Sequence, residues 1–240
     1  MAGARGAHFR GNAYLSLQTG ALEGGIMSNQ HQLDDLGLAA LISSRICHDV
    51  ISPVGAIANG LEVLDEEDDA QVREYALDLI RKSAAQASAK LQFARLAFGA
   101  AGSAGSEIDM NMARDIVLAV LDEAKHQLVW QVEPQTLVKD KAKLLLNLIS
   151  IAITTLPRGG TINLAIQGTM DRASMTILCR GQGARVPDGL SELISGQSGE
   201  ALDTLSIQPY YASRIASVAQ MRLVAGLQNE DVVLSANPLN

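Results

Sequence analysis

The sequence predicts an α+β protein, in which a helical hairpin that forms a four-helix bundle in a dimer is followed by an α/β sandwich domain. Three observations lead to this prediction. Apolar and small residues recur at alternating spacings of four and three between about residues 33 and 64, as in a bundle seam. A second helical pattern covers about 70–98, and short apolar runs alternate with helical ones further on, as in a two-layer sandwich. We therefore expect a disordered tail (1–30), a dimerising hairpin (31–99), a linker (100–106) and an α/β domain (107–240).

Composition narrows the class of protein. Hydrophobic residues make up 48% of the 240 but aromatic ones only 3%, so aliphatic side chains must build the core. The net charge of -7 disfavours nucleic acids and anionic membranes, because both reward clustered cations. Cys47 and Cys179 lie far apart without metal-ligand spacing, and no apolar run is long enough to cross a bilayer. A reducing, cytoplasmic location is expected.

The first helix is expected from about residue 33 to 64. Its predicted seam consists of Leu36, Ala40, Ser43, Cys47, Val50, Val54, Ile57, Leu61 and Leu64. The acidic run 65–69 ends the helix and supplies capping groups for the next one. The candidate core positions of that second helix are Val72, Leu79, Ala87, Leu91, Ala94 and Phe98. Two helices cannot enclose a core alone, so we expect two hairpins to join in a homodimer.

Around the hairpin lie two segments with little apolar content. The glycine-rich residues 1–25 indicate a tail, or sequence upstream of a start at Met27, and the run 99–106 has the composition of a linker. In the second domain the patterns predict helices, strands and turns, listed in chain order: a helix at 112–125, a strand at 128–132, a helix at 141–156, a turn at 157–160, strands at 161–166 and 174–179, a helix at 210–219, and a hairpin over 222–235 that turns near Asn229.

The run from His48 to Pro53 carries the strongest functional signal. It places an imidazole beside the carboxylate of Asp49, on the flank of the seam that faces solvent. Pro53 removes a backbone hydrogen bond to the carbonyl of Asp49 and should kink the helix. The pattern is typical of a histidine that accepts a phosphoryl group, because a neutral imidazole attacks through one nitrogen while the other keeps its proton. We predict His48, Asp49 and Ser52 as catalytic residues.

Further positions near His48 are candidates for contact with a partner. Arg45 precedes Asp49 by one turn and could pair with it or with the phosphoryl charge, while Gly55 and Asn59 continue the exposed stripe. On the second helix the small-residue run 83–89, which includes Gln86, is expected to face His48. It is flanked by Arg81, Lys82 and Lys90, whose charges would complement an acidic partner.

Simpler interpretations exist for the same residues. The small-residue run also fits plain helix packing, and the three flanking cations fit solvated surface residues. A metal site at 47–49 is not expected, because consecutive helical residues point about 100° apart. His31 and His126 have no partners in the sequence and are expected at the surface.

Taken together, these motifs make the chain resemble sensor histidine kinases from about residue 32 onward. The hairpin is similar to their dimerisation and histidine-phosphotransfer domain, and the second half to their ATP-binding domain. The run 143–153 with the turn 157–160 resembles the asparagine box of the kinases, where Asn147 is present but Ile151 stands at the magnesium-binding asparagine. Cys179 replaces the aspartate that recognises adenine, and the residues from Gln208 to Tyr211 replace the phosphate-binding glycines. We therefore expect a degenerate domain that holds neither nucleotide nor metal.

A chain with the phospho-accepting helix but without the nucleotide boxes is similar to the histidine phosphotransferases of alphaproteobacterial cell-cycle phosphorelays. The resemblance implies that His48 takes a phosphoryl group from the receiver domain of a CckA-like hybrid kinase and passes it to CtrA-like and CpdR-like response regulators. The receivers would supply the aspartates and Mg²⁺. Two alternatives stay open: a divergent autokinase that uses ATP, and a scaffold without chemistry.

Overall fold

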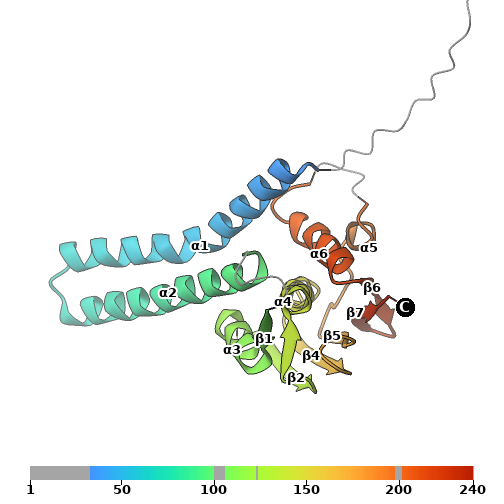
Figure 1. Ribbon diagram of the computed structural model, residues 1–240. Helices are drawn as coiled ribbons and strands as arrows, with labels where there is room; N and C mark the ends of the chain where they lie inside the picture. The colour runs from blue at the N-terminus through green and yellow to red at the C-terminus, as the bar shows by residue number, and fades with distance from the viewer. Residues whose placement is uncertain (1–32, 100–105, 123, 198–201, 240) are drawn as a thin grey trace, which may run out of the picture.

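A computed structural model describes residues 33–99, 106–122, 124–197 and 202–239. The chain begins with two long antiparallel helices, α1 (Asp35–Glu66) and α2 (Ala70–Ala97), which form the hairpin in Figure 1. Asp34 caps α1 by accepting a hydrogen bond from the amide of Gly37, and Asp69 caps α2 through the amides of Gln71 and Val72. The predicted hairpin and the capping role of the acidic turn are confirmed.

The face of α1 that packs within the hairpin differs from the predicted seam. From residue 46 to residue 64, one line of less exposed positions again has spacings of four and three: Ile46, Val50, Pro53, Ile57, Gly60 and Leu64. Gly60 allows the closest approach, since an added Cβ would lie 2.7 Å from Cγ1 of Ile80. The seam prediction is therefore correct at Val50, Ile57 and Leu64 only.

The remaining apolar positions form a second stripe on the outside of α1. Cys47, Ile51, Val54, Ala58 and Leu61 are all exposed in the single chain, with Val54 and Leu61 about half exposed (49% and 50%). We call these five residues the outer stripe. The predicted seam contained residues of both the outer stripe and the inner face. On α2 the prediction likewise fails at three positions, because Val72, Leu79 and Leu91 are exposed.

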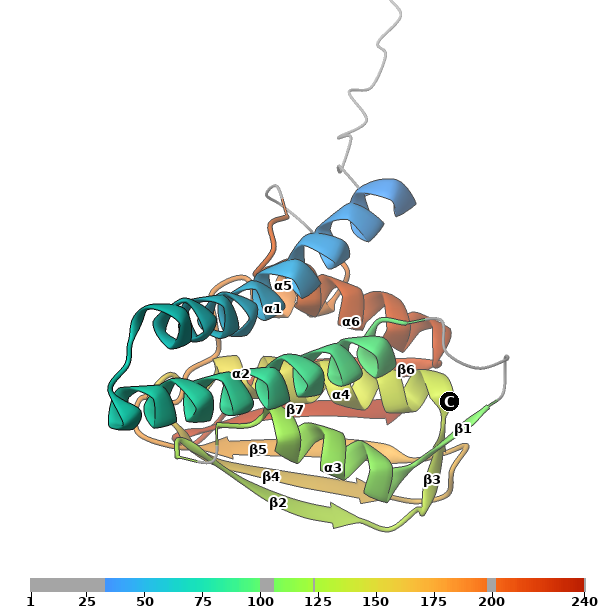
Figure 2. The ribbon, with the colours of Figure 1, turned by 90° about the vertical axis from the view of Figure 1, so that its left-hand side faces the viewer.

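Pro53 lies inside α1, and the helix continues through it. Figures 1 and 2 both show α1 bent partway along its length, as the missing amide of a proline allows. The first half of the helix runs beside α6 of the second domain, while the second half pairs with α2. The bend therefore separates the part of α1 that contacts the sandwich from the part that forms the hairpin.

The second half of the chain is a two-layer sandwich. Its elements are β1 (Glu107–Asp109), α3 (Met110–Val120), β2 (His126–Val132), β3 (Thr136–Val138), α4 (Lys139–Thr154), β4 (Gly160–Gln167), β5 (Ser174–Arg180), α5 (Leu190–Ile194), α6 (Ile207–Val218), β6 (Met221–Gln228) and β7 (Asp231–Pro238). The five-stranded sheet has the order β2-β4-β5-β7-β6, with only β2 and β4 parallel, and β1 pairs with β3 separately. Figure 2 shows α3, α4 and α6 on one face of this sheet. The predicted fold class is confirmed.

The core of the sandwich extends into the hairpin. Phe93, Leu96 and Ala97, near the end of α2, belong to the same buried cluster as the apolar residues of α4 and the sheet. Asn147 of α4 donates a hydrogen bond to the carbonyl of Ala97 (3.2 Å). The expected tail, and all of the expected linker but Ser106, lie outside the described residues. Within the described part of the chain, no helix combines the length and apolar character needed to span a membrane.

Candidate functional site

His48 projects from α1 into solvent. Its side chain is 64% exposed, and Ser52, Gly55 and Asn59 continue the exposed surface toward the tip of the hairpin. A Cβ added at Gly55 would meet no atom within 4 Å, so little bulk surrounds this stretch. The structure thus places the predicted histidine where another protein can reach its ring.

The carboxylate of Asp49 links His48 to the second domain. Its Oδ1 lies 3.4 Å from Nδ1 of His48, while its Oδ2 accepts a hydrogen bond from Nε of Arg45 at 3.0 Å. Arg45 is 18% exposed and also donates to the carbonyl of Thr204, in the loop before α6 (3.2 Å). An unbroken chain of contacts therefore runs from a loop of the sandwich to the imidazole. The contact with Thr204 spans 159 positions, and no sequence pattern signalled it.

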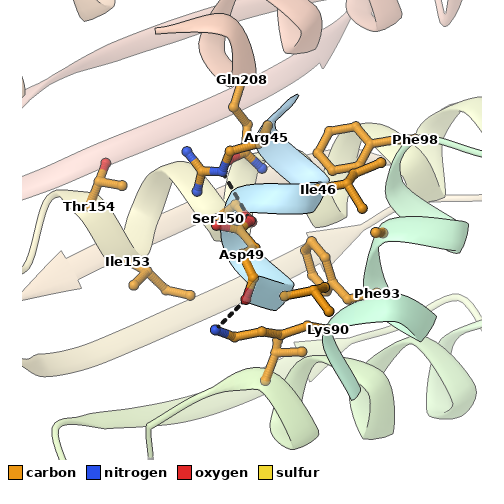
Figure 3. A pocket seen from close by; sticks show the side chains of 13 residues that line it. Arg45, Ile46, Asp49, Lys90, Phe93, Phe98, Ser150, Ile153, Thr154 and Gln208 are labelled. Atoms are coloured by element: carbon orange, nitrogen blue, oxygen red, sulfur yellow. Dashed lines mark hydrogen bonds and ion pairs between the residues drawn. The ribbon is translucent and has the colours of Figure 1, made fainter. Parts of the chain in front are cut away.

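Lys90 of α2 contacts the main chain of α1 next to His48. Its Nζ donates to the backbone carbonyl of Asp49 at 2.9 Å, as Figure 3 shows. By contrast, Arg81, Lys82 and Gln86 are exposed on α2, and Lys82 pairs with Asp78.

The expected contact of the run 83–89 with His48 is wrong in register. Lys90 lies level with Asp49, and Ile80 lies level with Gly60. Because the helices are antiparallel, the run 83–89 lies opposite the part of α1 nearer the tip of the hairpin.

A cavity of about 250 Å³ lies between the hairpin and the sandwich. Figure 3 shows that Arg45, Asp49 and Lys90 line it from the hairpin, and that Ser150 and Gln208 line it from α4 and α6. Its other walls are mainly apolar. The site therefore consists of this cavity, which both halves of the chain line, and of the exposed surface of α1 that carries His48.

Two positions that the sequence resemblance matches to nucleotide-binding residues of the kinases belong to the hydrophobic core here. Ile151 is 2% exposed and Cys179 is fully buried. Burial raises the pKa of the Cys179 thiol, although a hydrogen bond with Thr155 acts in the opposite direction. Asn147 is buried as well and binds the carbonyls of Ala97 and Lys143. This asparagine therefore holds the end of α2.

The residues predicted to replace the phosphate-binding glycines lie in a helix. The run from Gln208 to Tyr211 forms the first turn of α6, where Gln208 and Tyr210 are buried. Tyr211 packs on Phe98 with its ring centroid 5.5 Å away. The two tyrosines are therefore packing residues of α6.

His126, expected at the surface, is only partly exposed. Both of its ring nitrogens are buried and have no hydrogen-bond partner among the described residues. It begins strand β2, the edge strand that pairs with β4. Since a strand end and a surface loop look alike in sequence, the pattern did not distinguish the two positions.

Comparison with known proteins agrees with this arrangement. Residues 110–231 match the family described as the histidine phosphotransferase C-terminal domain. The chain therefore belongs to the histidine phosphotransferase family, as the sequence resemblance implied.

Two relatives are similar over most of their length. The protein phosphotransferase ChpT of Brucella abortus (strain 2308) is 44% identical over 211 residues, which cover 88% of this chain and 100% of that protein. A solved structure described as a bacterial phosphotransferase is 42% identical, with a TM-score of 0.77 over 85% of this chain and 98% of that one. These relatives support a protein phosphotransferase activity.

Proposed function

We propose that this protein is a phosphorelay intermediate that carries a phosphoryl group on His48. The group would come from a phosphorylated aspartate in the receiver domain of a CckA-like hybrid kinase. It would leave to an aspartate of a CtrA-like or CpdR-like response regulator. The observation that carries the proposal is an imidazole that is 64% exposed and has Nδ1 beside a carboxylate.

The geometry indicates which nitrogen reacts. When Nδ1–H donates to Asp49, Nε2 keeps its lone pair and points away from that carboxylate. Nε2 attacks the phosphorus of the donor, a P–N bond forms, and the P–O bond to the donor aspartate breaks with its electron pair on the carboxylate. In the second step a carboxylate oxygen of the acceptor attacks the same phosphorus, and the neutral imidazole leaves. Asp49 stabilises the positive charge that develops on the ring.

The burial of Ile151, Cys179 and Tyr210 supports a relay that uses no nucleotide of its own. Neither step needs a metal on this chain, and we expect Mg²⁺ on the receiver domains. A cavity of about 370 Å³ remains between the loop 185–190 and the start of α6. This cavity gives the autokinase alternative a structural basis, so an incubation with ATP is part of the test.

The outer stripe of α1 supports a homodimer. Its five exposed residues repeat at spacings of four and three, and a bundle seam needs that spacing. We propose that two hairpins bury these stripes against each other in a four-helix bundle. His48 follows Cys47 of the stripe by one residue, about 100° around the helix, so its ring would stay accessible in the dimer.

The test is incubation of the purified chain with a receiver domain that carries ³²P on its aspartate. We expect acid-labile, alkali-stable label on the wild type and on His31→Gln, and none on His48→Gln. Label on His48→Gln would refute the assignment. Label on the wild type from [γ-³²P]ATP alone would favour an autokinase. If the wild type took no label from either source while binding the receiver, a scaffold would be the better description.

A further inference from the structure

Pro53 leaves one backbone carbonyl of α1 without its normal partner. In a regular helix the amide of residue 53 would donate to the carbonyl of residue 49, but proline has no amide hydrogen. That carbonyl belongs to Asp49, whose side chain lies next to Nδ1 of His48. A carbonyl left without a donor in a partly buried place is costly. The turn that presents His48 therefore needs a donor from outside the helix.

Lys90 of α2 supplies this donor. Its Nζ lies 2.9 Å from the carbonyl oxygen of Asp49, and its side chain is partly buried in the cavity between hairpin and sandwich. Pro53 itself is buried, so a water molecule cannot easily take the same place. The ammonium group thus replaces the amide that proline lacks, and it does so from the opposite helix.

This contact fixes the residue on which the orientation of His48 depends. The side chain of Asp49 is held by Arg45 (3.0 Å) and its main chain by Lys90. Two independent contacts therefore determine where Oδ1 lies, and Oδ1 determines how the imidazole is turned. If the carbonyl were released, the helix could tilt about Pro53, and the ring would lose its alignment with an incoming phosphorus.

We propose that Lys90 is a positioning residue for phosphoryl transfer, which acts by capping the carbonyl that Pro53 leaves free. The proposal rests on the function proposed for His48. It differs from the surface role expected for Lys90 from the sequence, because the ammonium group is bound to the protein and does not face a partner.

The experiment measures single-turnover transfer from a phosphorylated receiver in excess, with the rate and the final amplitude recorded separately. We expect Lys90→Met to slow the transfer about tenfold with the wild-type amplitude, because the ring is misaligned while the chain stays folded. Lys90→Arg can still donate and should stay within about threefold of the wild type. Lys125→Met is the matched control, since it removes an exposed lysine of the second domain that pairs with Asp122.

A double-mutant cycle tests the mechanism itself. Pro53→Ala restores an amide at position 53, which can donate to the carbonyl of Asp49 and make Lys90 redundant. In that background, Lys90→Met should slow transfer less than about threefold, a strong departure from additivity. A tenfold loss in both backgrounds would overturn the proposal, as would a normal rate for Lys90→Met. Failure of the wild type to accept label would instead refute the function proposed for His48.

Discussion

Replacing Cys179 by aspartate is the most direct test of whether the second domain has lost its nucleotide site. In the kinases that the sequence resembles, an aspartate at this position recognises adenine. Here the side chain is fully buried in the core. The Thr155 hydroxyl beside it already donates to the carbonyl of Ala152 at 2.7 Å. A new carboxylate would find no cation at this position, and Asp231 lies near enough to disfavour negative charge there.

The cost follows from the pKa that a buried carboxyl group acquires. Burial of this kind raises the pKa of a carboxyl group by about 3 units or more, and each unit corresponds to about 1.4 kcal/mol. Cys179→Asp should therefore lose about 4 kcal/mol of unfolding free energy at pH 7.5 through ionisation alone. A group with a raised pKa in the folded state destabilises above its unfolded pKa of about 3.9, and at pH 5.0 the loss shrinks to about 1.5 kcal/mol.

Urea unfolding followed by circular dichroism measures this difference. Cys179→Asn serves as control because it has nearly the same shape and no charge, and all samples need the same protein concentration since dimerisation affects stability. We expect the aspartate variant to be less stable than the asparagine variant by about 4 kcal/mol at pH 7.5 and by about 1.5 kcal/mol at pH 5.0. Equal stability at pH 7.5, or ATP binding gained by the aspartate variant, would refute the reasoning.

Three further substitutions test the hairpin and its attachment. Leu61→Asp puts a charge into the outer stripe and should convert the proposed dimer to a monomer, as measured by light scattering. Glu74→Gln is the control and should leave the dimer intact, and a monomeric wild type would contradict the bundle. Arg45→Met frees the Asp49 carboxylate and should slow phosphorylation of His48 about fivefold in protein that circular dichroism shows to be folded, and a wild-type rate would show that the contact is incidental. Asn147→Ala leaves the Ala97 carbonyl at the end of α2 without this donor and should lower the unfolding free energy by about 2 kcal/mol. A loss below about 0.5 kcal/mol would mean that water replaces the amide.

The periodic part of the fold was predictable from sequence, but the assignment of its faces was not. Helical periodicity located α1 and α2 to within a few residues, because the spacing repeats over many turns. The same spacing occurs on both the inner face and the outer stripe, so the pattern could not separate contacts within the hairpin from the exposed stripe. Pro53 and Gly60 were especially hard to place. Both are poor helix formers, yet they are the two buried residues of α1.

The site was predictable where one short run carries it and unpredictable where distant segments meet. His48, Asp49 and Pro53 lie within six positions, and even the carbonyl freed by Pro53 follows from the sequence. The donors and acceptors around them do not follow, because Lys90 is 41 positions away and the Thr204 carbonyl has no side-chain signature. The short strands β1 and β3 were also missed, since three residues carry too little periodicity.

The burial of the end of α2 in the sandwich core has a kinetic consequence. A swing of the second domain toward His48 would require that core to open, so the surface around His48 keeps one arrangement. In the relay proposed above, donor and acceptor would then bind this same surface one after the other, and the phosphorylated protein would be released in between. Steady-state velocities measured against both receivers should accordingly give parallel double-reciprocal lines, the pattern of a ping-pong exchange.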